Sequence, residues 1–273
     1  YKIWLSEIIL QQTRIEQGTP YFLRFEKKFP TVFHLANAKE DEVMKLWQGL
    51  GYYSRARNLH ATAKNISENF GGKFPNDFYA LINLKGIGEY TAAAIASFAF
   101  NLPHAVVDGN VFRVLARVFG IEKNISSGEG KKYFNRLANE LLDKKNPAAF
   151  NQAIMNFGAM VCKPQNPLCT LCPFSKNCVA LKKNKVDSLP VKTKPAPLKK
   201  RFFNFLLIEH SKGFFIEKRG GSDIWQGLYQ FPLIETKKKA SIDELKKNSF
   251  LKNSLERIFT PYCLSKASLL PLR

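Results

Sequence analysis

The stretch LKGIGEYTAAAI, residues 84–95, decides how the fold of this 273-residue chain is interpreted. Gly86 and Gly88 flank Ile87, and a run of small apolar residues typical of a helix begins at about Tyr90. Glycines let a backbone come close to a ligand, and the free amides at a helix start suit a phosphate oxygen. The stretch therefore predicts a tight hairpin that leads into a helix and suits a phosphate oxygen. Gly-x-Gly alone is a weak signal, and an ordinary connection between helices is the alternative.

The charge of the chain favours a polyanionic partner. Lysine and arginine number 42 against 22 aspartates and glutamates, which gives a net charge of +20. A field of this size attracts nucleic acid, although a soluble protein that is merely rich in lysine is the simpler alternative. No apolar run approaches the ~18 residues of a membrane helix, and no secretory signal opens the sequence. We expect no membrane association, and we expect the natural chain to begin before Tyr1, which already lies in a helical pattern.

Three segments of different composition divide the chain. Residues 1–180 show apolar positions at helical spacing, broken by short stretches rich in glycine, proline and asparagine. Residues 181–201 hold seven lysines, one arginine and three prolines against one aspartate, which is typical of an extended basic linker. Residues 202–273 change to the short β-like runs FFNFLLIEH, GFFIEKR and LYQFPLIE, followed by a lysine-rich helical pattern over 241–258. The sequence thus predicts a mainly α domain, a linker and a partial α+β domain.

Four of the five cysteines lie in CKPQNPLCTLCPFSKNC, residues 162–178, with six, two and five residues between them. Zinc sites usually pair two Cys-x2-Cys units or include histidine, whereas only Cys169 and Cys172 form such a unit here. Disulfide frameworks belong to secreted proteins, and this pattern favours the reducing cytoplasm instead. Four thiolates in one compact loop are also able to bind the four irons of a cubane cluster. We favour such a cluster over zinc, with all four cysteines as ligands: Cys162, Cys169, Cys172 and Cys178.

The cysteine spacing after a helical region resembles the endonuclease III superfamily of DNA glycosylases, whose helix–hairpin–helix motif also matches residues 84–95. The resemblance implies a helix–hairpin–helix glycosylase domain over residues 1–180, with Gly86 and Gly88 against DNA. It implies a [4Fe–4S] cluster that orders a DNA-contacting loop carrying Lys163. In a bacterium such a protein would be associated with the nucleoid in the cytoplasm. An electron carrier is the alternative, but ferredoxins lack a strongly basic helical domain.

The stretch VVDGNVFRVLAR, residues 106–117, places Asp108 directly before a helix with an apolar face. Aspartate and asparagine are common helix caps, so a capping role for Asp108 or Asn110 is the simpler interpretation. The superfamily resemblance implies that Asp108 is the catalytic aspartate and that Asn110 orients its carboxylate. A carboxylate in this place stabilises positive charge on the sugar as the base leaves.

Two further stretches, WLSEIILQQT (4–13) and GLGYYSRARNL (49–59), resemble the MutY family of adenine DNA glycosylases. The likeness covers residues 1–178 and continues less strongly over 203–232. It implies removal of adenine mispaired with 8-oxoguanine or guanine in double-stranded DNA, as a step of base excision repair. It also implies that Glu7 is the acid that protonates N7 of the adenine. A glutamate whose pKa is raised in a closed pocket is able to do this at neutral pH, whereas a solvated helical glutamate is the alternative.

The same resemblance assigns contacts with the DNA and with the adenine. Gln11 and Tyr52 match residues that fill or wedge the base stack when the adenine is extruded. Gln152 matches a position near the edge of the adenine. Arg55 is a candidate phosphate contact, or simply a residue on a solvated helix face.

Position 90 separates two kinds of glycosylase. Lyase-competent members of the superfamily carry a lysine here that forms a Schiff base with the sugar, whereas this chain has Tyr90. We therefore expect a monofunctional enzyme that cleaves the N-glycosidic bond and leaves the strand intact. One alternative is an endonuclease III-type glycosylase and AP lyase that acts on oxidised pyrimidines. Another is a catalytically silent DNA-binding protein with an iron–sulfur centre.

The segment 202–273 resembles the Nudix-like C-terminal domain of the same family, most clearly in W-x-G-L-Y-x-F-P, residues 225–232. The resemblance implies that this domain recognises 8-oxoguanine. The pattern over 241–258 carries lysines in place of magnesium-binding glutamates, so we expect no pyrophosphatase activity. No histidine follows Thr260, where the family has a histidine-containing loop, and we expect a reduced preference for the lesion. We expect the protein to act as a monomer.

Overall fold

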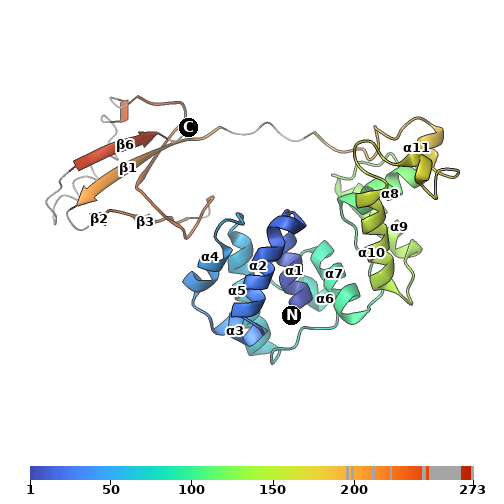
Figure 1. The fold of residues 1–273 in the computed structure, drawn as a ribbon, viewed down its shortest axis with the longest axis horizontal. Coiled ribbons are helices and arrows are strands. Elements are labelled where there is room, and N and C mark those ends of the chain that lie inside the picture. The colour runs from blue at the N-terminus through green and yellow to red at the C-terminus, as the bar shows by residue number, and fades with distance from the viewer. Residues whose placement is uncertain are drawn as a thin grey trace. The chain divides into compact units, whose positions relative to one another are not determined.

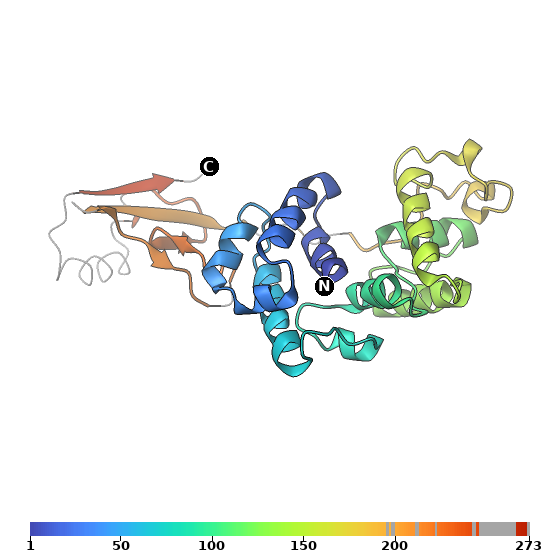
Figure 2. The same ribbon diagram turned by 60° about the horizontal axis from the view of Figure 1, so that its bottom comes forward.

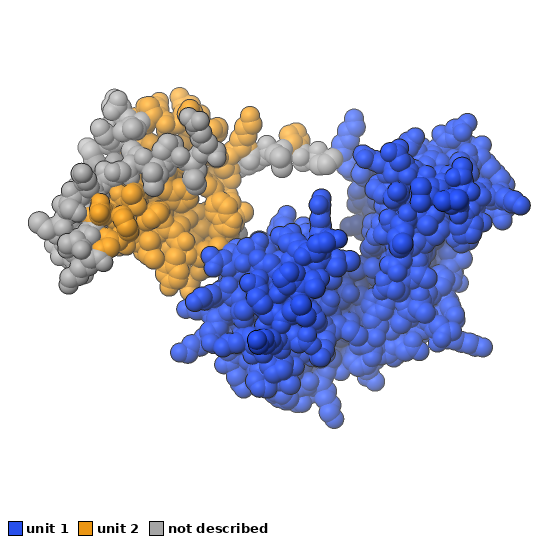
Figure 3. Space-filling model, viewed as in Figure 1, with its two compact units in different colours: residues 1–194 blue, residues 195–273 orange. Residues whose placement is uncertain are grey.

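The computed structural model divides the chain into two compact units, residues 1–194 and residues 195–273 (Figures 1 and 3). The residues that it describes are 1–194, 197, 200–210, 213–221, 223–241, 244–245 and 266–271, with the backbone alone for His210 and for the last segment. No helix in the described part of the chain is long and apolar enough to cross a membrane. The first unit holds nearly all the residues that the sequence singles out.

The first group of helices in unit 1 runs from blue to cyan in Figures 1 and 2 and encloses one hydrophobic core. Trp4, Phe25 and Trp47 are fully buried there, and the rings of Phe25 and Trp47 meet edge to face with centroids 5.8 Å apart. The helices are α1 (Lys2–Leu10), α2 (Ile15–Lys28), α3 (Val32–Asn37), α4 (Glu40–Trp47), α5 (Ser54–Asn69), α6 (Phe78–Ile82) and α7 (Glu89–Phe100).

The second group of helices in unit 1 has its own core, centred on Val111, Leu115 and Phe134. Its elements are α8 (Gly109–Phe119), α9 (Gly128–Leu141), α10 (Pro147–Met160), the 3-10 turn η1 (Cys169–Leu171) and α11 (Val179–Lys182). Helices α8 and α10 lie side by side (Figures 1 and 2). They touch closely, since a Cβ on Gly158 would lie 2.7 Å from the Asn110 Cβ. The prediction of a mainly helical first part is confirmed.

The connection between α6 and α7 is the hairpin that the sequence predicts. Asp77 caps α6 by accepting a hydrogen bond from Ala80 N at 2.8 Å. Gly86 has a φ of +80°, and a Cβ there would lie 2.7 Å from the Asn58 Cβ, so both backbone and space require glycine. Ile87 is buried and anchors the turn, while Gly88 precedes α7 and is exposed, with nothing within 4 Å of a Cβ placed there.

The basic linker begins later than the sequence predicts. Leu189 is buried, and its carbonyl accepts a hydrogen bond from Arg117 Nε at 3.1 Å. Ile125 N donates to Val191 O at 2.9 Å. These contacts hold the first part of the 181–201 segment on unit 1, which ends at Lys194. A high content of lysine and proline predicts a solvated segment, but composition alone does not show that one leucine within residues 181–201 is buried.

Unit 2 is built on a small antiparallel sheet, so the predicted change from helices to strands is confirmed. Its longest strand, β1 (Phe202–His210), pairs with β2 (Gly213–Phe214), β5 (Leu233–Thr236) and β6 (Lys266–Pro271). Strands β3 (Glu217–Lys218) and β4 (Tyr229–Gln230) form a separate pair. Most of the helical pattern predicted over 241–258 lies outside the described residues.

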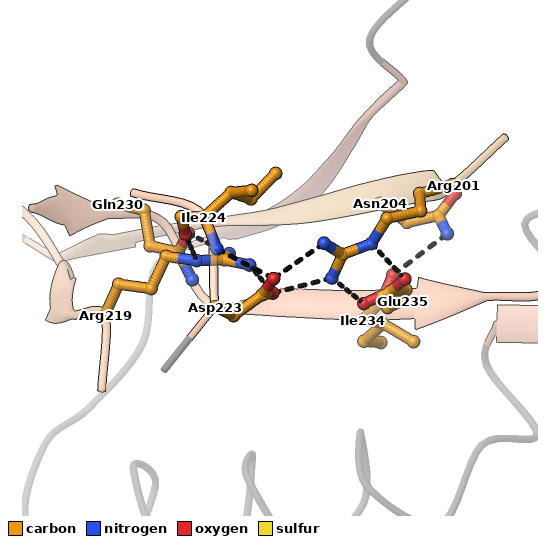
Figure 4. A network of polar contacts seen from close by, with 8 residues as sticks. All are labelled: Arg201, Asn204, Arg219, Asp223, Ile224, Gln230, Ile234 and Glu235. Atoms are coloured by element: carbon orange, nitrogen blue, oxygen red, sulfur yellow. Dashed lines mark hydrogen bonds and ion pairs between the residues drawn. The ribbon is translucent and has the colours of Figure 1, made fainter. Parts of the chain in front are cut away.

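A network of ion pairs joins Arg201, directly before β1, to Glu235 on β5 and to the turn that contains Asp223 (Figure 4). Arg201 donates to both Asp223 and Glu235, with its shortest contact to each at 2.6 Å. Arg219 is buried, and its Nε donates to Ile224 O at 2.6 Å. Exposed ion pairs contribute little one by one, but here the bidentate contacts of Arg201 and the buried guanidinium of Arg219 share Asp223 and fix the local geometry. The network thus holds the turn that precedes β4, in the stretch with the W-x-G-L-Y pattern.

Candidate active site

Three elements bring Glu7, Tyr90 and Asp108 together. Glu7 lies on α1, Tyr90 in the first turn of α7 and Asp108 directly before α8. The Tyr90 hydroxyl forms a hydrogen bond with Glu7, and the Asp108 carboxylate is close enough to act electrostatically on the same hydroxyl. Because α7 begins directly after the hairpin, the turn that we expect to hold DNA also positions Tyr90, which interacts with both carboxyl groups.

The two protonation equilibria at this site are shifted in the same direction. Burial raises the pKa of Glu7, and the hydrogen bond from Tyr90 opposes part of this shift. Burial, and then the negative charges of Glu7 and Asp108, raise the pKa of the Tyr90 hydroxyl. Tyr90 therefore stays neutral and serves as a hydrogen-bond donor, while Glu7 keeps its proton to a higher pH than an exposed glutamate.

Asp108 is fixed by two hydrogen bonds, one to each carboxylate oxygen. Oδ1 accepts from Val111 N at 2.8 Å, and Oδ2 accepts from Asn110 Nδ2 at 2.7 Å. The cap that the sequence predicts is present, and so is the amide of Asn110 against the carboxylate. The two interpretations of Asp108 are compatible, because a capped carboxylate is also an oriented one. A catalytic role for it stays a prediction.

Arg113 connects this carboxylate to the cysteine loop. It lies on α8 with 9% of its surface exposed. Its Nη2 donates to Asn110 Oδ1 at 2.8 Å and to Gly158 O at 2.7 Å. Its Nε donates to Cys162 O at 2.6 Å. Asn110, which donates to the Asp108 carboxylate, is thus held by Arg113, and Arg113 also binds the carbonyl of Cys162 in the cysteine loop.

Arg117, one turn further along α8, binds the same loop. Its Nη1 donates to Lys163 O at 2.7 Å and approaches Cys162 Sγ at 3.6 Å. Its Nη2 donates to Pro164 O at 3.2 Å. Sequence reasoning missed both arginines, because on a helix they read as ordinary charged residues. Their burial depends on carbonyls that come from some 45 residues away in the sequence.

The four clustered cysteines surround one cavity, which is also lined by Arg117 and by the apolar side chains of Val161 and Val186. None of the four is in a disulfide. Among the described residues, no group of three or more His, Cys, Asp or Glu is gathered closely enough to hold one metal ion. A cubane cluster takes one thiolate on each of four irons, so its ligands surround a volume instead of meeting at a point. The donor set and its arrangement fit such a cluster.

Two turns near the site carry exposed side chains in the left-handed backbone conformation. Tyr52 has a φ of +47° and is 66% exposed, as suits a residue that enters a base stack. Gln11, the predicted partner of Tyr52, is instead held inward, with its Nε2 donating to Thr91 Oγ1 at 3.1 Å. The exposed side chain of that turn is Gln12, which has a φ of +52°. Gln12 is thus the exposed glutamine of the pair in this structure, and the role predicted for Gln11 stays a prediction.

Arg55 is not a surface phosphate contact, which corrects that prediction. Only 8% of its surface is exposed, and its guanidinium donates to backbone carbonyls within the protein. A guanidinium that already serves several internal acceptors has few donors left for a phosphate.

The remaining predicted contacts stay predictions. Gln152 is exposed on α10 and donates to Asn156 Oδ1 at 2.9 Å. Lys163 is half-buried in the cysteine loop, where Arg117 fixes its carbonyl. Gly86 and Gly88 are exposed on the hairpin.

Comparisons with known proteins agree with this architecture. A family model for the HhH-GPD superfamily base excision DNA repair proteins matches residues 5–143. The structure of a thermostable thymine-DNA glycosylase aligns with a TM-score of 0.61 and 29% identity, covering 67% of this chain and 84% of that one. A non-covalent endonuclease III–DNA complex aligns with a TM-score of 0.59, and at 23% identity it supports the fold alone. The chain belongs to the HhH-GPD superfamily of base excision repair enzymes.

Curated relatives show to which group of enzymes within this superfamily the chain is similar. The adenine DNA glycosylase of Buchnera aphidicola subsp. Schizaphis graminum (strain Sg) is 40% identical over 248 residues, which cover 91% of this chain and 71% of the relative. The human adenine DNA glycosylase is 44% identical over 190 residues, which cover 69% of this chain and 35% of the relative. Within the superfamily, the chain is a member of the adenine DNA glycosylases and hence a DNA N-glycosylase.

Proposed function

We propose that the protein removes adenine mispaired with 8-oxoguanine or guanine, by acid-assisted cleavage of the N-glycosidic bond of an extruded base. The observation that carries this proposal is the meeting of Glu7, Tyr90 and Asp108 at the junction of α1, α7 and α8. Hydrolysis of a glycosidic bond needs one carboxyl group that donates a proton and one carboxylate that stabilises the sugar. Different surroundings suit these two groups to the two roles.

Glu7 is the proton donor. Burial raises its pKa, so a larger share of it is protonated at neutral pH than of a solvated glutamate. Its proton passes to N7 of adenine, and the electron pair of the bond between N9 and the sugar C1′ then leaves with the base. The neutral Tyr90 hydroxyl donates to Glu7 and supports the carboxylate that forms.

Asp108 stabilises the positive charge that develops on the sugar. Its two hydrogen bonds, from Val111 N and Asn110 Nδ2, hold it in place before the reaction, so little reorganisation is needed when charge appears. Water then adds at C1′, and its proton returns to Glu7, which restores the acid and leaves an abasic sugar.

The enzyme is monofunctional in this proposal. Tyr90 occupies the position of the lyase lysine, and a phenol cannot form a Schiff base with the sugar. The endonuclease III-type lyase, the alternative, needs an amine beside C1′. Tyr90, hydrogen-bonded to Glu7, fills the place where that amine would stand.

The four cysteines of the 162–178 loop bind a [4Fe–4S] cluster in this proposal. When bound, the cluster supplies no step of base removal and acts by ordering the loop. Arg113 and Arg117 tie the loop to α8, so an ordered loop supports the helix at whose start Asp108 lies. Lys163 then lies on a fixed segment from which it is able to bind a DNA phosphate.

Unit 2 acts as a Nudix-like recognition domain for 8-oxoguanine in this proposal, and one copy of the chain is the active form. The support is the small antiparallel sheet and the turn of residues 223–228, where the Arg219 guanidinium holds Ile224 O, next to the recognisable W-x-G-L-Y stretch. The 42 lysines and arginines supply attraction to the duplex that is independent of sequence.

A substrate panel tests the proposal. Duplexes with A:8-oxoguanine, A:G, A:T and thymine glycol:A are incubated with the protein, and the free base is identified by chromatography. We expect adenine from the first two duplexes and from them alone. Release of an oxidised pyrimidine in place of adenine would favour the lyase alternative.

A further inference from the structure

Arg55 lies between two turns of unit 1 and donates hydrogen bonds to both. It belongs to α5 and is 8% exposed. At the end of α1 the acceptors are Ile8 O (3.1 Å) and Ile9 O (2.9 Å), and in the turn after α1 they are Gln11 O (2.7 Å) and Thr13 Oγ1 (3.2 Å). In the turn after α4 they are Leu50 O and Gly51 O, both at 3.4 Å. A single planar guanidinium thus joins two segments some 40 residues apart.

Each of these turns presents one exposed side chain from a left-handed residue. Gln12 has a φ of +52° and lies between two acceptors of Arg55. Tyr52 has a φ of +47° and directly follows the acceptors in the other turn. Neither residue is a glycine, and such conformations persist only where the surroundings hold them. Arg55 contributes that support at both turns.

The second turn is also held from the side of α4. Trp47 Nε1 donates to Gly51 O at 2.9 Å. The Arg55 guanidinium lies 5.0 Å from the centre of the Trp47 ring and 5.8 Å from that of Tyr52. The arginine therefore contacts the backbone of the turn and the face of the ring that the turn exposes.

We propose that Arg55 is a positioning residue that sets the separation of Gln12 and Tyr52, so that both side chains enter the base stack together when a base is extruded. The inference rests on the proposed function. An aromatic ring fills the gap between base steps, and an amide offers donors and an acceptor to an unpaired base. The two side chains act together only at the right separation, because a misplaced side chain loses its contacts with the neighbouring bases.

A purely structural role is the alternative. Buried carbonyls at the end of α1 need donors, and Arg55 supplies them whatever the two exposed side chains do. The two roles differ in one respect. A residue that acts by spacing two side chains loses its effect on DNA once both side chains are gone, whereas a structural residue does not.

The test is a mutational cycle in the full chain. Arg55→Lys is made in the parent, in Gln12→Ala, in Tyr52→Ala and in the variant with both alanines. Lysine keeps the charge but cannot serve both turns. Each protein is bound to a duplex with an abasic-site analogue beside 2-aminopurine, whose fluorescence rises on unstacking. Single-turnover adenine release from an A:8-oxoguanine duplex is measured in parallel.

We expect Arg55→Lys to reduce the fluorescence rise and to slow adenine release roughly tenfold in the parent, and to change neither in the double-alanine variant. Ile66→Val, also buried on α5, is the control for lost stability and should leave both readouts near the parent's. If Arg55→Lys does not fold, Thr13→Val removes one acceptor at 3.2 Å and carries the same cycle.

An equal effect of Arg55→Lys in all four backgrounds would overturn the proposal. Failure of the proposed function looks different: the parent would release no adenine, while the fluorescence cycle would keep its pattern. A third outcome is that the parent releases adenine normally while Arg55→Lys leaves the 2-aminopurine fluorescence unchanged in every background. That result would support the proposed function and contradict the positioning role of Arg55.

Discussion

The side chain at position 90 decides whether the sugar meets an amine or a phenol. Tyr90 is hydrogen-bonded to Glu7, and the negative charge of Asp108 acts on its hydroxyl. In the proposed mechanism it therefore lies where a nucleophile would have to stand. A neutral phenol in this place supports the acid and forms no covalent bond with the sugar. In the proposed mechanism this one residue separates simple base removal from base removal with strand cleavage.

Replacing Tyr90 with lysine should introduce covalent trapping. In Tyr90→Lys, the amine would stand beside C1′ and form a Schiff base that borohydride reduces. We expect the trapped protein–DNA complex to rise from near background to at least roughly tenfold above it, while Tyr90→Phe stays at background. The two variants are compared on an abasic duplex by denaturing gel. Equal trapping in both would mean that position 90 does not face the sugar.

Glu7 should make the stability of unit 1 depend on pH. Burial raises its folded-state pKa, whereas in the unfolded chain a glutamate has a pKa of about 4.3. The protonated form is favoured in the folded state, so this contribution to stability is complete below about pH 4.3 and is lost as pH rises through the raised pKa.

Glu7→Gln should therefore be more stable than the parent at pH 8, and the difference should disappear toward pH 4. Urea unfolding followed by helical circular dichroism measures this. Glu16→Gln, an exposed position on α2, is the matched control and should show no such dependence. A parent and a Glu7→Gln variant with the same stability difference at both pH values would contradict the assignment of Glu7 as a buried acid.

At the scale of elements, α8 links the proposed chemistry to the cysteine loop. Its start is capped by Asp108, and further along the helix Arg113 and Arg117 bind the carbonyls of Cys162 and Lys163. Residues at three levels of one helix thus connect the carboxylate with the loop. A well-ordered loop and a well-placed Asp108 are expected to depend on each other.

The hairpin between α6 and α7 offers two glycines with different requirements. Gly86→Ala meets a φ of +80° and the Asn58 side chain, and should lower the free energy of unfolding by roughly 1–3 kcal/mol. Gly88→Ala meets open space and should leave stability within about 0.5 kcal/mol of the parent. If the exposed turn holds a DNA phosphate closely, the second variant should still weaken duplex binding several-fold. Unchanged binding by Gly88→Ala would argue against a close phosphate contact.

The elements that periodicity and turn residues define were predictable from the sequence. Helical spacing predicts the helices of unit 1, and Gly86 with Gly88 predicts the hairpin. The β-like runs after position 201 correspond to the strands of unit 2. These patterns are local, so a single sequence contains them.

What the sequence could not predict depends on contacts between distant segments. Arg55 reads as a solvated helix residue until the turns after α1 and α4 are seen to meet around it. Which of Gln11 and Gln12 is exposed depends on a left-handed φ that neither residue type requires. The role of Arg113 could not be predicted for the same reason, because its hydrogen-bond acceptors come from α10 and the cysteine loop.

At the scale of the whole molecule, the net positive charge and the four-cysteine loop have complementary roles in DNA binding in the proposed function. A net charge of +20 brings the protein to DNA, but it does not place the reacting groups. The cysteines surround a cavity that Arg117 of α8 also lines, and the loop that they form carries Lys163. A cluster in that cavity would hold a basic loop in one conformation.

Iron content tests the cluster. The protein purified aerobically should be yellow-brown, with absorbance near ~400 nm and about four irons per chain. Cys172→Ser should lower both, whereas Cys263→Ser, at the fifth cysteine, should leave the spectrum unchanged. Metal analysis that finds stoichiometric zinc and no iron would contradict the cluster.

The central claim is that Glu7 and Asp108 together release adenine, and single-turnover kinetics tests it most directly. Adenine release from an A:8-oxoguanine duplex is measured for the parent, Glu7→Gln and Asp108→Asn, with the Kd of each protein for the same duplex. We predict release by the parent, with strand breaks only after alkali. We predict rates lower by on the order of 10² or more in each variant, with Kd changed by less than about threefold, because phosphate contacts supply most of the affinity. Release by either variant at the parental rate would contradict the account.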